Sequence, residues 1–246
     1  MRSRAEQFVR PPTLTATVAE HIKEAIFRGS PPPGAPLHEV ELSKSLGVSR
    51  GTVREALRYL QDETLVEIHP HQGASVTRLS PRKAREIYTL RAQLEPYAVR
   101  LAMGRSAYTR GDLDELDALV RRLGDLERSG DPEHRGDLFE IITADMEFHR
   151  VMCGRSEHEM LMGMLRSLQS QTRIFILNTI LYHSDLELDE PTHRAILTAI
   201  QSGDPEHAEA VVHKHIGDAG TSLVTHMEAH AVAGREEVVG SRVQGG

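Results

Sequence analysis

The chain has 246 residues and a formal net charge of −7, with 39% hydrophobic and 26% charged residues, no Trp and a single Cys. These values are typical of a globular protein and exclude a membrane-embedded chain, a fibrous repeat and a disulfide-stabilised scaffold. We find no signal peptide and no apolar run of membrane-spanning length, so we expect a cytoplasmic protein without a membrane partner.

The negative charge is concentrated in the second part of the chain. Residues 1–78 contain 10 Lys and Arg against 9 Asp and Glu, whereas residues 79–246 contain 19 against 27. The net charge of the whole chain therefore does not exclude binding of nucleic acid by the first part. Because that part is close to neutral, such binding requires a local basic face and would be strengthened by a second copy of the chain.

The first part carries the pattern of three helices followed by a β-hairpin. Apolar residues at helical spacing predict helices over residues 13–27, 37–46 and 49–61. Two short alternating runs around a turn that contains Pro and Gly predict the strands of the hairpin, over residues 65–69 and 74–77. This order of elements predicts a winged helix-turn-helix domain.

The turn between the second and third of these helices is typical of a helix-turn-helix. Gly47 can adopt the left-handed conformation that ends a helix, and Ser49 is a favourable N-cap for the next one. On that next helix, Arg50, Arg54 and Arg58 lie off the apolar stripe. Arginines on one face of a helix suit the major groove of DNA, where they meet phosphates and guanine edges. The alternative is an ordinary helical hairpin with a solvated basic face.

Residues 14–78 resemble the DNA-binding domain of the GntR family of bacterial regulators. The resemblance rests on Ile26-Phe27-Arg28-Gly29, Pro33-Gly34-Ala35-Pro36-Leu37, Gly47-Val48-Ser49-Arg50, Val53-Arg54-Glu55-Ala56-Leu57, and Leu65-Val66 followed by Gly73. It implies that the DNA-binding residues are Ser49, Arg50, Gly51, Thr52 and Arg54, with His71 and Gly73 in the wing. The sequence departs from the family pattern at Thr52, where many members have proline, and this departure bears on base preference.

From residue 80 onward the sequence shows only helical patterns. Ser80 and Pro81 form a helix start, and apolar stripes recur through a series of helices as far as about residue 231. Residues 232–246 are rich in glycine and charged residues, and we expect a disordered tail there. The predicted organisation is a flexible basic arm, a winged helix-turn-helix domain, an all-α domain and this tail, over residues 1–12, 13–78, 80–231 and 232–246.

Three predicted helices of the all-α domain carry ionisable side chains within their apolar stripes. Asp145 and His149 lie four residues apart on one helix, and His193 and His215 occupy similar positions on two others. Burial of an unpaired carboxylate or imidazole is costly. One shared divalent cation would satisfy all four, because Asp oxygen and His nitrogen are ligands of zinc and other first-row metals. The alternative is an Asp–His hydrogen-bond network without an ion.

The order of these residues also resembles the FCD domain, which follows the winged helix in the FadR-type subfamily of GntR regulators. This resemblance covers about residues 80–230 and includes Arg91-Ala92-Gln93-Leu94-Glu95 and Ala199-Ile200-Gln201-Ser202-Gly203-Asp204. It implies an antiparallel helical bundle in which Asp145, His149, His193 and His215 hold one divalent metal ion per chain. Zinc is the expected ion, with nickel and manganese as alternatives. The resemblance further implies a small organic-acid effector that reaches an open coordination position.

Two arginines are candidates for binding the carboxylate of the effector. Arg91 borders the inner stripe of its helix, and Arg173 lies on a helix that we expect to line the bundle. Arginine binds a carboxylate through two parallel hydrogen bonds, which makes both residues suitable. A salt bridge within the protein is the alternative role for each.

We therefore predict a mainly α fold with an N-terminal winged helix-turn-helix domain and a C-terminal all-α antiparallel bundle. The predicted function is a homodimeric bacterial transcriptional regulator, a repressor, that binds a palindromic double-stranded operator and responds to a small organic acid. In one alternative the metal ion is itself the signal. In another, the metal site activates water as in a hydrolase. We prefer a regulator to an enzyme, because the sequence shows no partner base at a suitable spacing.

Overall fold

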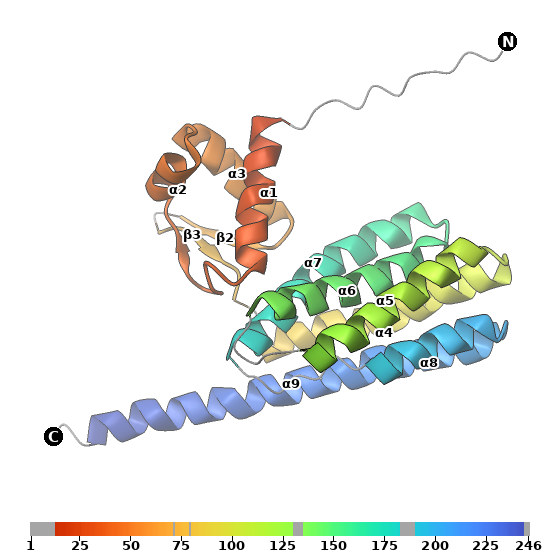
Figure 1. Cartoon of the computed structure of the whole chain (residues 1–246). Helices are drawn as coiled ribbons and strands as arrows, with labels where there is room; N and C mark the ends of the chain where they lie inside the picture. Colours follow the sequence, from red (N-terminus) through yellow and green to blue (C-terminus); the bar gives the residue numbers. More distant parts are fainter. Residues whose placement is uncertain (1–12, 71, 79, 130–134, 183–189, 244–246) are drawn as a thin grey trace, which may run out of the picture. The chain divides into compact units, whose positions relative to one another are not determined.

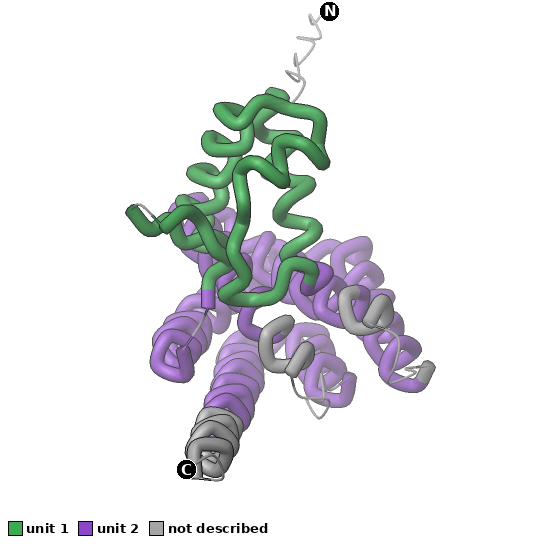
Figure 2. Tube along the Cα trace, turned by 90° about the vertical axis from the view of Figure 1, so that its left-hand side faces the viewer, with its two compact units in different colours: residues 1–26, 30–77 green, residues 27–29, 78–246 purple. Residues whose placement is uncertain are grey.

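The computed structural model describes residues 13–70, 72–78, 80–129, 135–182 and 190–243. The described chain is mainly helical with one small antiparallel sheet, which confirms the predicted fold class. It divides into two compact units, one containing residues 1–26 and 30–77 and the other containing residues 27–29 and 78–246 (Figure 2). Within the described residues, none of the helices is both long and apolar enough to cross a membrane.

The first unit contains the helices and the wing that the sequence predicts. Its helices are α1 (Leu14–Phe27), α2 (Glu39–Leu46) and α3 (Arg50–Asp62), and its strands are β1 (Pro36–Leu37), β2 (Val66–His69) and β3 (Gly73–Val76) (Figure 1). The strands form an antiparallel sheet in the order β1-β3-β2. The predicted basic arm, residues 1–12, lies outside the described residues.

Strand β1 was not expected, because the sequence pattern places residue 37 at the start of a helix. Leu37 instead pairs with Ala74 of β3 and is buried, and α2 begins at Glu39. Burial of Leu37 against the sheet stabilises the extended conformation. A strand of two residues is too short to show the alternation by which strands are recognised in a sequence.

Helices α2 and α3 meet at the predicted turn. Gly47 has a φ of 66°, and its N–H donates to the carbonyl of Ser43, which closes the C-terminus of α2. Ser49 caps α3, because its side chain accepts a hydrogen bond of 3.1 Å from the N–H of Thr52. The apolar stripe of α3 is buried and consists of Val53, Ala56, Leu57 and Leu60. This packing leaves the arginines of α3 on its exposed face.

The second unit consists of helices α4 to α9 in the part that the structure describes. Their bounds are α4 (Pro81–Gly104), α5 (Arg110–Ser129), α6 (Arg135–Gly154), α7 (Glu159–Tyr182), α8 (Glu190–Gln201) and α9 (Pro205–Val243) (Figure 1). Helix α4 packs along α9, α5 packs against α6 and α8, and α8 packs against α9. All six helices contribute to one apolar core. The polar side chains that enter this core are therefore the exceptions that need an explanation.

Helices α4 and α9 approach each other closely at Gly220. A Cβ atom placed on Gly220 of α9 would lie only 2.5 Å from the Cβ of Tyr88 in α4. No larger residue fits there unless one of the helices moves, so glycine permits this approach. The two helices also carry Arg91 and His215, which line the same cavity.

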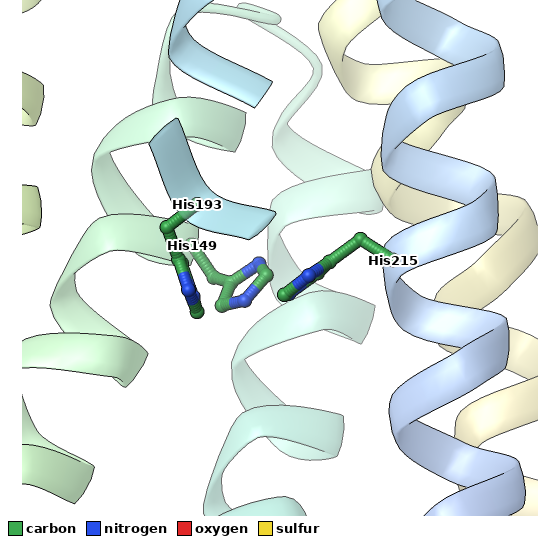
Figure 3. A group of neighbouring side chains, drawn as sticks. All are labelled: His149, His193 and His215. Carbon is green, nitrogen blue, oxygen red and sulfur yellow. The ribbon is translucent and has the colours of Figure 1, made fainter. Parts of the chain in front are cut away.

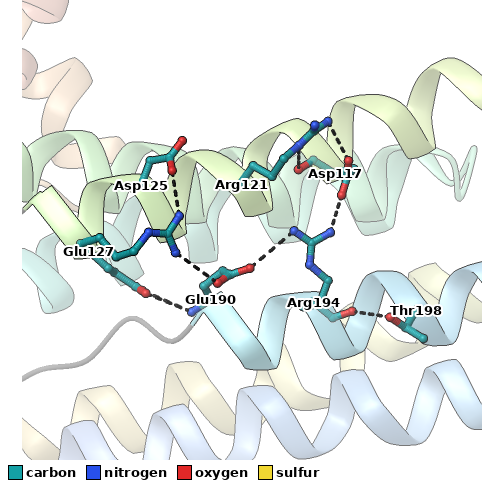
Figure 4. A network of polar contacts seen from close by, with 8 residues as sticks. Asp117, Arg121, Asp125, Glu127, Glu190, Arg194 and Thr198 are labelled. Atoms are coloured by element: carbon teal, nitrogen blue, oxygen red, sulfur yellow. Dashed lines mark hydrogen bonds and ion pairs between the residues drawn. The ribbon is translucent and has the colours of Figure 1, made fainter.

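Helix α8 is attached to α5 by a network of charged side chains (Figure 4). Arg194 pairs with Asp117, and the carboxylate of Glu190 accepts a hydrogen bond of 3.5 Å from Arg194. The backbone N–H of Glu190 donates to the carboxylate of Glu127 at 3.2 Å. These contacts hold the first turns of α8 in place, and with them the buried imidazole of His193.

Helix α9 is longer than the sequence predicts. It continues to Val243, whereas the pattern suggested a helix end near residue 231 and a disordered tail over residues 232–246. Gly234 and Gly240 lie within this extension, and each lowers helix stability by about 1 kcal/mol without preventing a helix. The glycine content was therefore a poor guide to the helix end. Residues 244–246 lie outside the described part of the chain.

Candidate DNA-binding surface and metal centre

The exposed face of α3 carries most of the predicted DNA-binding residues. Arg50, Gly51 and Arg54 are exposed, and the hydroxyl groups of Ser49 and Thr52 are 2.9 Å apart at the start of the helix. In the wing, Gly73 has a φ of 89° and begins β3, where it pairs with His69 of β2. The other predicted wing residue, His71, lies outside the described residues.

Arg54 forms an ion pair with Glu39, a residue that the sequence pattern did not connect with the DNA-binding surface. Its Nε donates to Oε1 of Glu39 at 3.0 Å, and its Nη2 donates to Oε2 at 2.7 Å. The hydrogen bonds from Arg54 lower the pKa of Glu39. This pairing occupies one edge of the guanidinium and leaves Nη1 for a base edge or a phosphate. Glu39 lies on α2, so no spacing within α3 could have revealed it.

Three histidines meet inside the second unit. His149 of α6, His193 of α8 and His215 of α9 point toward one another from three separate helices (Figure 3). One ring nitrogen from each lies within 4.8 Å of those of the other two. His149 and His193 are buried, and His215 is half-buried. The fold therefore brings three of the four predicted metal ligands together.

Asp145, the fourth predicted ligand, lies beside the histidines on α6. Its Oδ1 is 3.0 Å from Nε2 of His193 and 4.0 Å from Nε2 of His149. Burial alone would disfavour the ionised carboxylate, but the hydrogen bond from His193 and the proximity of His149 and Arg91 outweigh it and lower the pKa of Asp145. The side chain that faces His193 is therefore a carboxylate.

His215 is held in its neutral form. Its Nδ1 is 3.0 Å from the hydroxyl of Thr192 on α8, so Nε2 is the nitrogen left for the cluster. Burial lowers the pKa of His215 well below its ordinary value, and the neighbouring His193 and His149 lower it further. Neutral imidazole is the form of histidine that binds metal ions.

A second buried carboxylate reaches His149 from α4. The Oε2 of Glu95 lies 2.7 Å from Nδ1 of His149, and its Oε1 accepts a hydrogen bond of 2.5 Å from Nε of Arg91. Burial opposes ionisation of Glu95, but the charge of Arg91 and the contact with His149 outweigh this effect and lower its pKa to about 2. Sequence reasoning did not assign Glu95 a role. The sequence shows Arg91 and Glu95 four residues apart beside an apolar stripe, but this spacing does not indicate that Glu95 also contacts His149.

The cluster lines a cavity of about 210 Å³. Its polar lining includes Arg91, Asp145, Thr192 and the three histidines, and its apolar lining includes Tyr88, Ile176, Ile216 and Ala219. Arg91 is only 2% exposed, and its Nη2 makes no hydrogen bond to the part of the protein that the structure describes. A buried guanidinium with an unused donor on a cavity wall favours an anionic ligand.

The second arginine predicted to bind the effector lies elsewhere. Arg173, on α7, donates from Nη2 to the hydroxyl of Thr143 at 2.8 Å and is not among the residues that line the described cavity. Its partial burial lowers its pKa. Of the two predicted arginines, the structure thus places Arg91 beside the histidines.

Both parts of the chain match known families. Residues 14–76 match the bacterial regulatory proteins of the gntR family, and residues 86–218 match the FCD domain. The chain belongs to the GntR family. It combines the family's helix-turn-helix domain with an FCD domain, as the sequence predicts.

Curated relatives of this GntR protein carry the names of transcriptional regulators, and a solved structure shares its fold. It is 32% identical to the "Uncharacterized HTH-type transcriptional regulator YdhC" of Bacillus subtilis, over 79% of this chain and 84% of the relative. It is 30% identical to the "Probable D-xylose utilization operon transcriptional repressor" of Paenarthrobacter nicotinovorans, over 83% and 86%. The structure of Escherichia coli McbR/YncC is similar in fold, with a TM-score of 0.72 and 24% identity over 90% of this chain and 100% of that one.

These comparisons make the GntR protein a DNA-binding transcriptional regulator. The family and its curated relatives regulate transcription and are not enzymes, so the hydrolase alternative is wrong.

Proposed function

We propose that this GntR protein is a metal-containing regulator of the FadR type. In this proposal it is a homodimeric repressor whose affinity for a palindromic operator changes when a small organic acid binds. The observation that carries the proposal is the convergence of His149, His193 and His215 beside Asp145. The name of the Paenarthrobacter relative supports repression. A regulator that binds the bacterial chromosome acts in the cytoplasm.

The DNA contacts are assigned to the start of α3 and to the wing. In helix-turn-helix proteins the N-terminal residues of the recognition helix contact base edges. That assignment covers Ser49, Arg50, Gly51, Thr52 and Arg54 on α3, with His71 and Gly73 in the wing.

The DNA half of the proposal is tested by Arg54→Ala. We expect about a 10–100-fold loss of affinity for a duplex selected from a random DNA library, because one guanidinium contact to a base edge is removed. Arg82→Ala on α4 is the control, since Arg82 is exposed and, among the described residues, forms an ion pair only with Glu86 of its own helix. Equal binding by Arg54→Ala and the wild type at physiological salt would show that Arg54 does not read the operator.

The homodimer is supported by exposed apolar side chains on the second unit. Leu90 and Tyr97 on α4 are 52% and 36% exposed, and Met160 and Met164 on α7 are 71% and 53% exposed. Helices α4 and α7 contact each other. Dimerisation through such side chains would present two recognition helices to the half-sites of a palindrome. Sedimentation of the full chain tests the dimer, and a monomer at micromolar concentration would contradict it.

The residues of the cluster suit a divalent ion. When two ligands bind one ion with bonds of roughly 2.1 Å, their donor atoms lie about 3 Å apart, and Asp145 and His193 show this spacing at 3.0 Å. Three imidazoles and a carboxylate fit zinc, and they also fit nickel and manganese. A bound ion would supply a Lewis-acidic position that a carboxylate can approach.

The buried guanidinium of Arg91 indicates the chemical class of the effector. Arg91 lines the cavity, its buried Nη2 makes no hydrogen bond to the described residues and would donate to an anion, and its Nε is held by Glu95. A cavity of about 210 Å³ accommodates a small molecule only. We therefore assign a small carboxylic acid as the effector, which would change operator affinity by binding more tightly to one arrangement of the protein.

A panel of small carboxylic acids tests this assignment by thermal shift. An acid of the right class is expected to raise the melting temperature of the metal-loaded wild type, but not that of chelator-treated protein or of metal-loaded Arg91→Gln. Equal shifts in all three samples would place the acid away from Arg91 and the ion.

The second candidate function is a regulator for which the ion is itself the signal, and it rests on the same histidines. Titration of the metal-free protein with zinc, nickel or manganese in the absence of any organic acid distinguishes the two. A change in operator affinity with the ion alone favours metal sensing. Operator affinity that responds only to ion and acid together favours the organic-acid regulator.

A further inference from the structure

We propose that Glu95 is the positioning residue of this centre, a single buried carboxylate that orients both the ligand His149 and the anion-binding Arg91. The inference rests on the proposed function, because it assigns a common partner to a metal ligand and to the effector-binding arginine. It concerns the geometry of protein side chains, and one of its tests requires no metal.

Glu95 sets the proton position on His149. Its Oε2 lies 2.7 Å from Nδ1, whereas the other ring nitrogen, Nε2, lies 4.0 Å from Asp145 on the side of the cluster. Because Oε1 of the same carboxylate is paired with the guanidinium of Arg91, Oε2 is left to accept a hydrogen bond, so in the neutral imidazole Nδ1 carries the proton and Nε2 keeps its lone pair. Metal-binding histidines commonly donate their second N–H to a carboxylate in this way. Glu95 would thereby leave Nε2 of His149 available to an ion bound by the cluster.

The same carboxylate orients Arg91. Its Oε1 accepts from Nε of Arg91 at 2.5 Å, which fixes one edge of the guanidinium of a residue that lines the cavity. The guanidinium carbon also lies 5.1 Å from the centre of the Tyr88 ring. With one edge fixed by Glu95, Arg91 loses little conformational freedom when it binds an anion.

These contacts are shielded from bulk solvent. Arg91 is 2% exposed, Glu95 is 0% exposed and His149 is 1% exposed. A displacement of Glu95 would therefore change the direction of Arg91 and of His149 at once. The chain of contacts from Arg91 through Glu95 to His149 links the anion-binding group directly to a metal ligand, without passing through the ion.

The tautomer of His149 tests the inference in metal-free, full-length protein. Long-range ¹H–¹⁵N spectra of protein labelled at histidine report which ring nitrogen is protonated, and His149→Gln identifies the signal by its loss. We expect the Nδ1–H tautomer for His149 in the wild type. The Nε2–H tautomer in the wild type would overturn the proposal.

Cobalt affinity tests the effect of Glu95 on the ion. Glu95→Gln alone leaves a buried guanidinium without its counter-ion, so the informative comparison is Arg91→Gln against Arg91→Gln/Glu95→Gln. We expect the double variant to bind Co²⁺ about 10–100-fold more weakly than Arg91→Gln, with a visible spectrum that differs from that of the single variant. Glu86→Gln, an exposed change on the same helix, is the charge control.

The two measurements test the role of Glu95 and the metal site separately. Equal Co²⁺ affinity and spectra for the single and the double variant would overturn the role of Glu95, because a merely structural glutamate would change folding and not the ligand field. Failure of the wild type to bind Co²⁺ would overturn the proposed metal site, while the tautomer of His149 still tests its orientation by Glu95. If the double variant is unfolded by circular dichroism, the tautomer measurement decides.

Discussion

The two units of the protein use the same chemical pair in opposite environments. On the DNA-binding surface, Arg54 and Glu39 have side chains 54% and 32% exposed, whereas in the helical unit Arg91 and Glu95 are 2% and 0% exposed. An exposed pair contributes little to stability, and its members can exchange one partner for water or phosphate. A buried pair cannot exchange its partners, because removing one leaves an uncompensated charge. The first unit thus carries an adaptable charged surface, and the second carries a preorganised centre.

Truncation of one arginine in each pair gives the largest expected difference. Arg91→Ala is expected to lower the free energy of unfolding by about 3–5 kcal/mol, because it leaves Glu95 as a buried charge with only His149 for a partner. Arg54→Ala is expected to cost less than about 1 kcal/mol. Urea denaturation followed by circular dichroism measures both values. Similar losses in the two variants would show that burial does not distinguish the pairs.

The tightness of the buried unit is tested at two glycines of α9. Gly220→Ala is expected to destabilise the protein by about 1–3 kcal/mol, because the new Cβ would lie 2.5 Å from the Cβ of Tyr88. Gly217→Ala is the matched control, since a Cβ there meets nothing within 4 Å and raises helix propensity by up to about 1 kcal/mol. Melting temperatures of both variants check this prediction. A neutral Gly220→Ala would mean that α4 and α9 separate easily.

Asp112 is an intermediate case, because a buried carboxylate is paired there with a half-exposed arginine, Arg155. Hydrogen bonds from Thr109 and Arg155 lower the pKa of Asp112 from 3.8 to about 2. The lowered pKa stabilises the fold above about pH 4 by at most about 2 kcal/mol, and this contribution is lost as the pH falls toward 2. Asp112→Asn is expected to remove this part of the acid dependence. An unchanged unfolding profile between pH 4 and 2 would contradict it.

The smallest expected effect concerns the exposed cap of the recognition helix. Ser49 accepts a hydrogen bond from the N–H of Thr52, so Ser49→Ala is expected to cost about 1 kcal/mol of stability. Ser49→Asp, which retains a capping oxygen, is expected to restore most of it. Thermal unfolding of the three proteins provides the measurement. A loss well above 2 kcal/mol would show that this surface is less adaptable than the comparison implies.

Some residues of the two sites could be recognised from the sequence, and others could not. His149, His193 and His215 were recognisable because ionisable residues within apolar stripes are anomalies that helical periodicity exposes. The contact between Glu95 and His149 could not be recognised, because it joins residues on α4 and α6 that no spacing in the sequence connects. For the same reason Glu39 was missed as the partner of Arg54, although the exposed arginines themselves followed from the pattern of α3.

The fold was predictable where periodicity extends over several turns. The winged helix and the all-α second part follow from it, as does the cap at Ser49. The short strand β1 does not follow from periodicity, because it has only two residues. The extension of α9 does not follow from it either, because isolated glycines do not end a helix that is otherwise favourable. Tertiary contacts decide such cases, and a single sequence does not show them.

The most direct test of the account is the metal content of the purified full-length protein. Elemental analysis compares the wild type with His149→Ala/His215→Ala, and circular dichroism confirms that the variant is folded. The account predicts about one divalent ion per chain in the wild type and none in the variant. A folded wild type that takes up no divalent ion, even after incubation with zinc, nickel or manganese, would contradict it. The four residues would then form a hydrogen-bonded polar core in a regulator that senses its signal elsewhere.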